Sequence, residues 1–384
     1  MTAKKPLSIV YASEWESPRE VTWSGTTYFL NKALQKISDV QEVDFTVSIP
    51  QKIIAKLSAA GIYDGKFTIN KIPPTITRQY YKSMKKNYIR EISKIDEDSI
   101  VFLVGCMDGF PGRYYTYQDL CFEALLDLKE SGEEAFQYTR YQDLSLEDLE
   151  REAQNQARAY EKAAGVFTMG EWLAKFLVEK AGLPPEKVHF AGGGSNMDVS
   201  LIKPLREGNK FLFVGKQFEN KGGPLICDAF SIVREKYMPE AELYIAGPQV
   251  QPEESKREGI HFLGQLPYEE LVHYYNICDV FCMPSIFEAY GLVFGEALIF
   301  GLPCIGRRAF EMEYFIEDGK NGALLDETDS TEDAAKKMYN VITDETIIQY
   351  VAENREYYLK EYSWDTVAQR IIKVIEQDNR AYIE

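Results

Sequence analysis

The sequence predicts an α/β protein with two domains, each built on a parallel β-sheet that helices cover. Short apolar runs such as Leu7–Ala12 and Ser99–Gly105 alternate with longer segments of helical spacing through most of the chain. This alternation is typical of strand–helix–strand units, whose parallel strands are buried on both faces. A chain of 384 residues is also long enough for two cores of ordinary size.

Composition narrows the class of protein. The chain is 45% hydrophobic and 27% charged, which is typical of a soluble globular protein. No stretch approaches twenty apolar residues, and Leu7–Ala12 is too short for a signal-peptide core, so we expect a cytoplasmic protein. The formal net charge of −17 argues against nucleic-acid binding, which depends on neutralising phosphates. The six cysteines form no C-x-x-C pair and only three histidines are present, so we expect reduced cysteines and no metal site.

In the amino-terminal half, the first strand is expected at Leu7–Ala12 and the strongest at Ser99–Gly105, because both are continuous apolar runs. Residues Tyr115–Arg158 are acidic and helix-rich in pattern. The other elements expected in this half are the strands Val43–Ser48, Phe67–Ile72 and Gly165–Met169 and the helices Tyr28–Ile37, Thr75–Lys94, Gln142–Ala164 and Glu171–Ala181, with a short helix between the strands at Val43–Ser48 and Phe67–Ile72.

The helix expected at Thr75–Lys94 combines an apolar face with a strongly basic one. Apolar residues recur every four positions from Ile76 to Ile92. An ordinary amphipathic helix with a solvated face accounts for this pattern, and so does contact with an anionic membrane surface or a charged acceptor. The cations that would make a peripheral membrane contact are Arg78, Lys82, Lys85, Lys86 and Arg90.

The carboxyl-terminal half begins after a polar linker, Lys203–Lys210, with a second strand–helix series that starts at Phe211. Ser330 is the expected N-cap of a late helix, with Asp333 at the capping-box position. The elements expected in this series are the strands Phe211–Lys216, Glu242–Gly247, Ile260–Leu263 and Val280–Met283 and the helices Tyr268–Asn276, Leu292–Phe300, Thr331–Ile342, Asp344–Lys360 and Trp364–Gln377.

The stretch Pro284–Ile305 carries two carboxylates eight positions apart. Glu288 lies in the loop after a buried strand, and Glu296 lies one to two turns into the helix Leu292–Phe300. Helical side chains lean toward the N-terminus, so both carboxylates could reach one ligand that spans the loop and the first turn. A carboxylate accepts both hydrogen bonds of a vicinal diol, and the free amides at a helix start favour phosphate. Compensation of the helix N-terminus is the alternative role for both residues.

Two lysines flank the first strand-to-helix loop of the same half. Lys216 ends the strand that begins at Phe211, and Lys221 lies just before a helix whose first turn carries Pro224. Two cations five positions apart around such a loop can hold both sides of a pyrophosphate. Either lysine alone would be an ordinary surface residue. Their position in a strand–loop–helix unit is what favours the phosphate interpretation.

Taken together, these motifs resemble the retaining GT-B glycosyltransferases of the E-x7-E type, which are glycosyltransferase family 4-like. The segments V-G-K, I-A-G-P, F-L-G-Q-L, D-V-F-C-M-P-S and F-E-A-Y-G-L follow one another in the family's order between residues 167 and 326. The amino-terminal third resembles the family only in organisation. The resemblance implies two Rossmann-like domains facing a central cleft: residues 1–203 for the acceptor and 204–364 for the donor. The last helix, 365–384, would pack back on the first domain.

The resemblance also implies an activity. The protein would transfer a sugar from a UDP- or GDP-sugar to a hydroxyl of a glycan, glycolipid or small-molecule acceptor, with retention and without a metal or other cofactor. Lys216 and Lys221 would neutralise the leaving diphosphate, Glu296 would bind the ribose and Glu288 would orient the donor sugar. A sugar-nucleotide epimerase or phosphorylase of the same fold and a non-catalytic accessory subunit are the alternatives. The further donor-site residues would be Gly215, Ala289, Tyr290, Gly291, Leu292, Ser24 and Gly25.

The chain departs from the family pattern at three points. Relatives usually carry Gly-Arg where this chain has Gly215-Lys216, which keeps the charge but loses the bidentate fork. In the turn before the first helix only Gly25 matches the usual Gly-Gly, and Ser24 or Thr26 could simply cap that helix. Near the expected strand Ser99–Gly105, relatives place a histidine on the donor sugar. Asp108 is the only ionisable residue there, and it could act catalytically or form a turn before a glycine.

Overall fold

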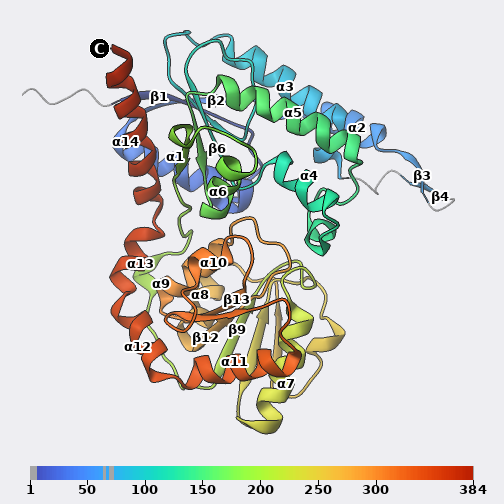
Figure 1. Cartoon of the computed structure of the whole chain (residues 1–384), viewed down its shortest axis with the longest axis vertical. Helices are drawn as coiled ribbons and strands as arrows, with labels where there is room; N and C mark the ends of the chain where they lie inside the picture. Colours follow the sequence, from blue (N-terminus) through green and yellow to red (C-terminus); the bar gives the residue numbers. More distant parts are fainter. Residues whose placement is uncertain (1–6, 64–65, 69–72, 384) are drawn as a thin grey trace, which may run out of the picture. The chain divides into compact units, whose positions relative to one another are not determined.

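The computed structural model describes residues 7–63, 66–68 and 73–383. Contacts divide the chain into two compact units. Unit 1 comprises residues 1–169, 173–192 and 367–384, and unit 2 comprises 170–172 and 193–366. Each unit contains a six-stranded sheet in which every neighbouring pair of strands is parallel, with helices against the sheet (Figure 1). The predicted α/β fold with two parallel-sheet domains is confirmed.

In unit 1 the strands lie in the order β2-β1-β5-β6-β7-β8. The inner strands β5 and β7 are apolar and buried, whereas the edge strand β2 is mostly exposed and polar. The strands are β1 Ser8–Ser13, β2 Asp39–Asp44, β5 Val101–Val104, β6 Tyr114–Gln118, β7 Gly165–Thr168 and β8 Val188–Phe190, and a separate antiparallel pair is formed by β3 Gly61–Tyr63 and β4 Lys66–Thr68. The helices are α1 Thr26–Ile37, α2 Ile49–Ser58, α3 Arg78–Ile92, α4 Phe122–Glu130, α5 Leu146–Lys162, α6 Glu171–Glu179 and α14 Trp364–Ile383, of which α14 belongs to unit 1 from residue 367 onward.

In unit 2 the strands lie in the order β11-β10-β9-β12-β13-β14. α7 and α11 pack against each other along one side of this sheet (Figure 1). The strands are β9 Lys210–Val214, β10 Glu242–Ala246, β11 Ile260–Gly264, β12 Val280–Cys282, β13 Cys304–Arg307 and β14 Gly322–Leu325. The helices are α7 Gly223–Lys236, α8 Tyr268–Ile277, α9 Leu292–Phe300, α10 Met312–Phe315, α11 Thr331–Thr343, α12 Glu345–Glu353 and α13 Arg355–Glu361.

Two strands of unit 1 differ from the sequence expectation. The strand expected at Val43–Ser48 is β2, which ends at Asp44, because its polar residues suit an exposed edge better than an interior position. The central strand β6, Y-Y-T-Y-Q, lies in a region expected to be helical. A search for aliphatic runs does not detect its tyrosines. They can be buried because their hydroxyls are hydrogen-bonded; the Tyr114 hydroxyl, for example, donates to the Ala159 carbonyl at 2.6 Å.

Other expectations need smaller corrections. β13 and β14 were not expected, and the helix expected at Asp344–Lys360 is interrupted at Asn354. Part of the strand expected at Phe67–Ile72 is β4, while residues 69–72 lie outside the described residues. The capping box of Ser330 and Asp333 at the start of α11 is confirmed. All six cysteines are free, as expected.

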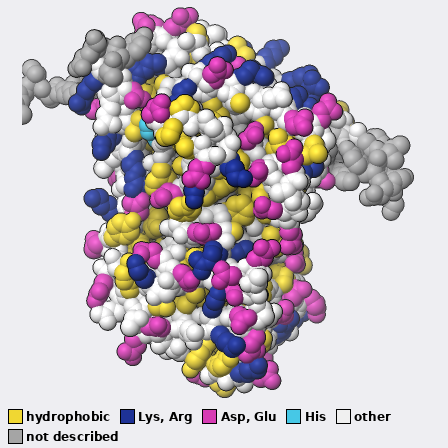
Figure 2. Space-filling view, in the orientation of Figure 1, with side chains coloured by type: hydrophobic (Ala, Val, Ile, Leu, Met, Phe, Trp, Pro, Cys, Tyr) yellow, Lys and Arg dark blue, Asp and Glu magenta, His cyan; other side chains and the backbone are white. Residues whose placement is uncertain are grey.

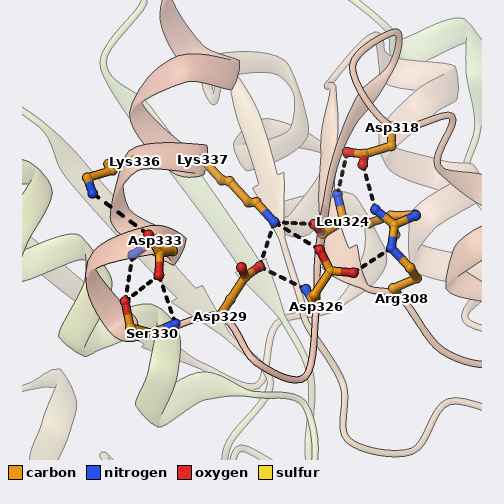
Figure 3. Close-up of polar contacts among 9 residues, drawn as sticks. All are labelled: Arg308, Asp318, Leu324, Asp326, Asp329, Ser330, Asp333, Lys336 and Lys337. Atoms are coloured by element: carbon orange, nitrogen blue, oxygen red, sulfur yellow. Dashed lines mark hydrogen bonds and ion pairs between the residues drawn. The ribbon is translucent and has the colours of Figure 1, made fainter.

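A chain of ion pairs anchors the loops at the ends of β13 and β14 (Figure 3). Arg308 pairs with Asp318 and Asp326, both at 2.6 Å. Lys337 on α11 pairs with Asp329 at 2.5 Å and with Asp326 at 3.5 Å. Because Arg308 already pairs with two aspartates, it stabilises the loops at this edge of the sheet.

The excess negative charge is not gathered into one region on the face that Figure 2 shows. Acidic and basic side chains are interspersed there on both units. The residues that the structure describes include no helix long and apolar enough to cross a membrane. They also contain no group of three or more histidine, cysteine, aspartate or glutamate side chains placed to hold a metal ion.

Candidate functional site

The strand order of unit 2 reverses direction between β9 and β12, which are neighbours in the sheet. In open α/β sheets, ligands bind beyond the carboxyl ends of the strands at such a reversal. The loop 215–222 follows β9 and the loop 283–291 follows β12, so both loops stand at this point. The candidate site of unit 2 is therefore made of these two loops and the helices that they lead into.

The two loops are held tightly against each other. Asn220 accepts the Ile286 N–H with its carbonyl at 2.7 Å and the Phe287 N–H with its side chain at 3.1 Å. Gly222 has a φ of 75°, and a Cβ there would lie 2.4 Å from the Pro284 carbonyl oxygen. Only glycine permits this backbone approach. The loops therefore behave as one layer at the end of the sheet.

Lys221 and Glu288 meet within this layer. The Lys221 ammonium lies 2.7 Å from a Glu288 carboxylate oxygen, and the Ser285 hydroxyl donates to the same oxygen at 3.2 Å. The neighbouring glycines leave room for the pair: a Cβ on Gly215 would lie 2.7 Å from Lys221 Cγ, and one on Gly291 would lie 3.1 Å from Glu288 Cγ. Four residues predicted from the sequence are thus brought together.

The N-terminus of α9 opens onto the same layer. Its N-cap is Gly291, in the left-handed region with a φ of 95°, and no side chain of the described residues caps it. The Phe294 N–H donates to the Gly291 carbonyl at 3.0 Å, which leaves the amides of Leu292 and Val293 at the helix start without a capping side chain. Such a terminus attracts anions because its amides and dipole favour negative charge.

Glu296 occupies a different environment from Glu288. Its side chain is only 2% exposed, and it accepts hydrogen bonds from the Tyr275 hydroxyl at 3.3 Å and from the Asn196 backbone N–H. Burial raises the pKa of the Glu296 carboxyl to about 7. No lysine or arginine among the described residues pairs with it. A buried carboxylate without a counter-ion is costly, and such groups concentrate at functional sites.

The other predicted residues of unit 2 divide into two kinds. Lys216 is exposed and has no ion-pair partner among the described residues. Ala289 and Tyr290 instead fasten the loop: the Ala289 carbonyl accepts the Trp172 indole N–H at 2.5 Å, and the Tyr290 hydroxyl accepts the Gly193 N–H at 2.8 Å. The contacts of these two residues fix the position of the loop that carries Glu288.

Arg307 is a candidate that the sequence analysis missed. It ends β13, the strand beside β12, and although the residue is only partly buried, its Nε is buried and has no acceptor among the described residues. A Cβ on Gly306 would face α9 and α10, so alternation places Arg307 on the opposite face of the sheet, the α7 side, where Lys221 also lies. Its neighbour Arg308 pairs with two aspartates (Figure 3). The apolar run that ends in two arginines after Pro303 was the available signal.

Unit 1 has its own reversal of strand order, between β1 and β5. The turn that contains Ser24 and Gly25 follows β1. Trp23, Ser24 and Gly25 are consecutive left-handed residues, with φ of 47°, 55° and 89°. The N-cap position of α1 is occupied by Gly25, so neither Ser24 nor Thr26 holds the N-cap position itself. A left-handed non-glycine residue costs roughly 1–2 kcal/mol.

Asp108 follows β5 and is held by two lysines. Its carboxylate lies 2.5 Å from Lys85 on α3 and 3.4 Å from Lys162 at the end of α5. Burial alone would raise the pKa of the Asp108 carboxyl, but the hydrogen bonds and charges of the two lysines outweigh it, and the pKa is lowered. A carboxylate with a lowered pKa is a weak general base. Because Lys85 pairs with Asp108, its charge no longer adds to the basic face of α3.

Comparison with known proteins finds a family model that matches part of unit 2 and solved structures that share the fold of the chain. Residues 202–357 match the family model described as glycosyl transferases group 1. A D-inositol 3-phosphate glycosyltransferase of Corynebacterium urealyticum is 28% identical over 176 residues, which is 42% of this chain and 41% of the relative. The chain thus spans less than half the length of this relative.

Two solved structures cover nearly the whole chain. Sucrose-phosphate synthase from Thermosynechococcus elongatus has a TM-score of 0.68 at 15% identity, over 98% of this chain and 100% of that one. The Anabaena protein HepE, solved in complex with UDP-glucose, has a TM-score of 0.63 at 12% identity, over 97% and 100%. These similarities show a shared GT-B fold. The similarity to the glycosyl transferases group 1 family is carried by residues 202–357, which lie in unit 2.

Proposed function

We propose that the protein is a retaining glycosyltransferase that uses a nucleoside diphosphate sugar, a UDP- or GDP-sugar, as donor. The observation that carries this proposal is the Lys221–Glu288 pair beside the uncapped start of α9, at the strand reversal of unit 2. The departing diphosphate needs positive charge that is already in place when the glycosidic bond breaks. Lys221 and the first amides of α9 supply it.

Lys216 and Arg307 would complete the anion site. Lys216 is exposed in the same loop as Lys221, and Arg307 lies on the α7 side with no counter-ion among the described residues. An arginine presents two parallel donors to a phosphate, which compensates for the lysine at the Gly215-Lys216 position. We therefore add Arg307 to the residues that hold the diphosphate.

The two glutamates would bind the sugars of the donor. Glu296 is an unpaired, buried acceptor suited to the ribose diol, and Glu288 would orient the transferred sugar through its ring hydroxyls. Glu288 shares its charge with Lys221, so it is a poor covalent nucleophile. Retention would follow from attack on the face of the leaving group, with the departing phosphate accepting the proton of the acceptor hydroxyl. In this scheme the described residues stabilise the charge without a metal.

The acceptor side of the proposal belongs to unit 1. Ser24, Gly25 and Asp108 follow the strands at the reversal of that sheet, where an acceptor hydroxyl would be received. The acceptor would be a glycan, a glycolipid or a small molecule, and the relative named for D-inositol 3-phosphate supports a polyol of this kind. Peripheral contact of α3 with an anionic membrane remains part of the proposal, carried by Arg78, Lys82 and Lys86.

The test is incubation of the purified protein with a panel of UDP- and GDP-sugars. Slow release of nucleoside diphosphate in the absence of acceptor, lost in Lys221→Ala and kept in Lys236→Ala, is the expected result. Lys236 is the matched control because it lies at the other end of α7 and pairs with Glu332 on the surface. Interconversion of two nucleotide sugars would instead identify an epimerase, and phosphate-dependent release a phosphorylase. Absence of any nucleotide binding would identify an accessory subunit.

A further inference from the structure

The helix α2 in unit 1 presents its large aliphatic side chains to solvent. Ile49, Ile53 and Leu57 are 75%, 55% and 60% exposed, and Ile54 is 52% exposed. Residues four apart on a helix lie one above the other, so Ile49, Ile53 and Leu57 form a continuous row with Ile54 beside it. We call these four side chains the α2 outer face. Contiguous exposed apolar surface of this kind marks an interaction site in a soluble protein.

Within residues 7–63, 66–68 and 73–383, no element of the fold buries the α2 outer face. The only residue that α2 buries is Ala55, which packs against Val47 and Tyr80. The helix is fixed from that inner side by reciprocal hydrogen bonds, both 3.1 Å long, between the Gln51 and Asn87 side-chain amides. Contact with the rest of unit 1 therefore involves the small and polar residues of α2. Its large aliphatic residues are left for something outside the described structure.

The charges around the α2 outer face are positive. Lys52 and Lys56 each precede a member of the row by one residue, so they border it along one side. The adjacent helix α3, which packs on α2, exposes Arg78, Lys82 and Lys86. This basic surface stands out in a chain whose formal net charge is −17. A partner of the α2 outer face must therefore offer an apolar interior beneath a negatively charged surface.

An anionic lipid bilayer has both properties. Aliphatic side chains on one face of a helix enter the acyl boundary while flanking lysines stay with the anionic headgroups. A second copy of this chain fits less well, because a two-fold interface would bring Lys52 and Lys56 of each copy against the same residues of the other. The acidic remainder of the chain would be repelled by the same bilayer, which confines contact to this surface.

We propose that the α2 outer face docks the protein on an anionic membrane surface by inserting Ile49, Ile53, Ile54 and Leu57. The docking is peripheral and reversible. It deepens the proposed function by placing a lipid-linked or lipid acceptor within reach of unit 1, and it rests on that function only for this consequence. The basic helix α3 then contributes attraction, while α2 provides the apolar anchor.

The experiment is co-sedimentation of the full chain with vesicles. Wild type should sediment with phosphatidylglycerol-containing vesicles and remain in solution with pure phosphatidylcholine. The double variant Ile53→Ser/Leu57→Ser should lose binding by at least about tenfold, because two of the four inserted side chains are removed. The control Leu205→Ser changes an aliphatic residue of unit 2 that is also exposed and should bind as wild type. Release of nucleoside diphosphate without vesicles should be equal in all three proteins, which separates failure of docking from failure of catalysis.

Three outcomes would overturn the proposal. The wild type could remain in solution with every lipid composition. The double variant could sediment as well as wild type, which would place the contact elsewhere. The wild type could instead form a dimer that Ile53→Ser/Leu57→Ser dissociates, or bind an acidic protein in preference to vesicles, and either result would assign the α2 outer face to a protein interface.

Discussion

The two units share one sheet plan but use their strand reversals differently. At the reversal of unit 2, residues from two loops converge on one ion pair, Lys221 with Glu288, and on the uncapped start of α9. At the reversal of unit 1, the candidates are a left-handed turn at Ser24 and an aspartate already neutralised by two lysines. A site that must hold a diphosphate needs charges in fixed places. A site that receives a hydroxyl needs shape more than charge, and shape leaves a weaker trace in the sequence.

The largest effect is expected for Lys221→Ala. Loss of one preorganised charge at the leaving group should lower kcat by about 10²- to 10³-fold. The variant also leaves the buried Glu288 carboxylate without its cation, so a thermal melt must accompany the kinetics. Lys236→Ala is the control. If a folded Lys221→Ala protein has unchanged kinetics, Lys221 does not neutralise the leaving group, and the reversal of unit 2 is not the diphosphate site.

Glu296→Gln should separate function from stability. The pKa of Glu296 is raised to about 7 from an ordinary 4.5, so between these pH values the folded state keeps a proton that the unfolded state has lost. The free energy of unfolding therefore falls as pH rises through this window, by roughly 3 kcal/mol in total for this group. Glu296→Gln should be more stable than wild type at pH 8, by up to that amount, and bind nucleoside diphosphate about tenfold or more weakly.

The pH dependence of nucleotide affinity tests whether the Glu296 carboxylate contacts the ribose. Nucleotide affinity of the wild type should increase as pH rises through about 7, because the ionised carboxylate accepts both ribose hydroxyls. In Glu296→Gln this dependence should flatten. Calorimetric titration with UDP and GDP at pH 6 and pH 8 measures both. An equal affinity at the two pH values in wild type would mean that Glu296 does not contact the ligand. Glu311, whose pKa burial raises to about 8, affects stability in both proteins alike.

Arg307 and Arg308 offer a matched pair of adjacent arginines. Arg307→Ala should weaken diphosphate binding by about tenfold, on the scale of a lost charge-assisted hydrogen bond. Arg308→Ala should leave binding unchanged, because Arg308 pairs with Asp318 and Asp326, and its effect should appear as a lower melting temperature instead. If both variants bind nucleotide as wild type does, Arg307 lies outside the anion site.

The smallest effect is expected for Asp108→Asn in unit 1. Because Lys85 and Lys162 already lower the pKa of Asp108, removing its charge should change kcat by less than about threefold at neutral pH. A loss on the scale of Lys221→Ala would show that Asp108 acts on the reacting sugar. The contrast between the two units would then disappear.

The sequence predicted four of the six strands of unit 2, β9 to β12, and four motif residues that the structure brings together, whose roles stay predictions. Glu288, Lys221, Gly215 and Gly291 come together because each lies at a strand end or helix start, which the pattern of apolar residues marks. The sequence analysis missed β6 because tyrosines resemble polar residues in a search for apolar runs. It placed β2 a few residues too late in the chain because an edge strand need not be apolar. Arg307 was missed with the strand that carries it. The pairing of Asp108 with Lys85 depends on the packing of α3, which no local pattern encodes.

The most direct test is a crystal structure with a nucleoside diphosphate bound. We expect the diphosphate to lie within hydrogen-bond distance of the Lys221 ammonium and the first amides of α9, with the ribose hydroxyls on Glu296. A nucleotide bound in unit 2 away from Lys221, or bound on unit 1 alone, would contradict it.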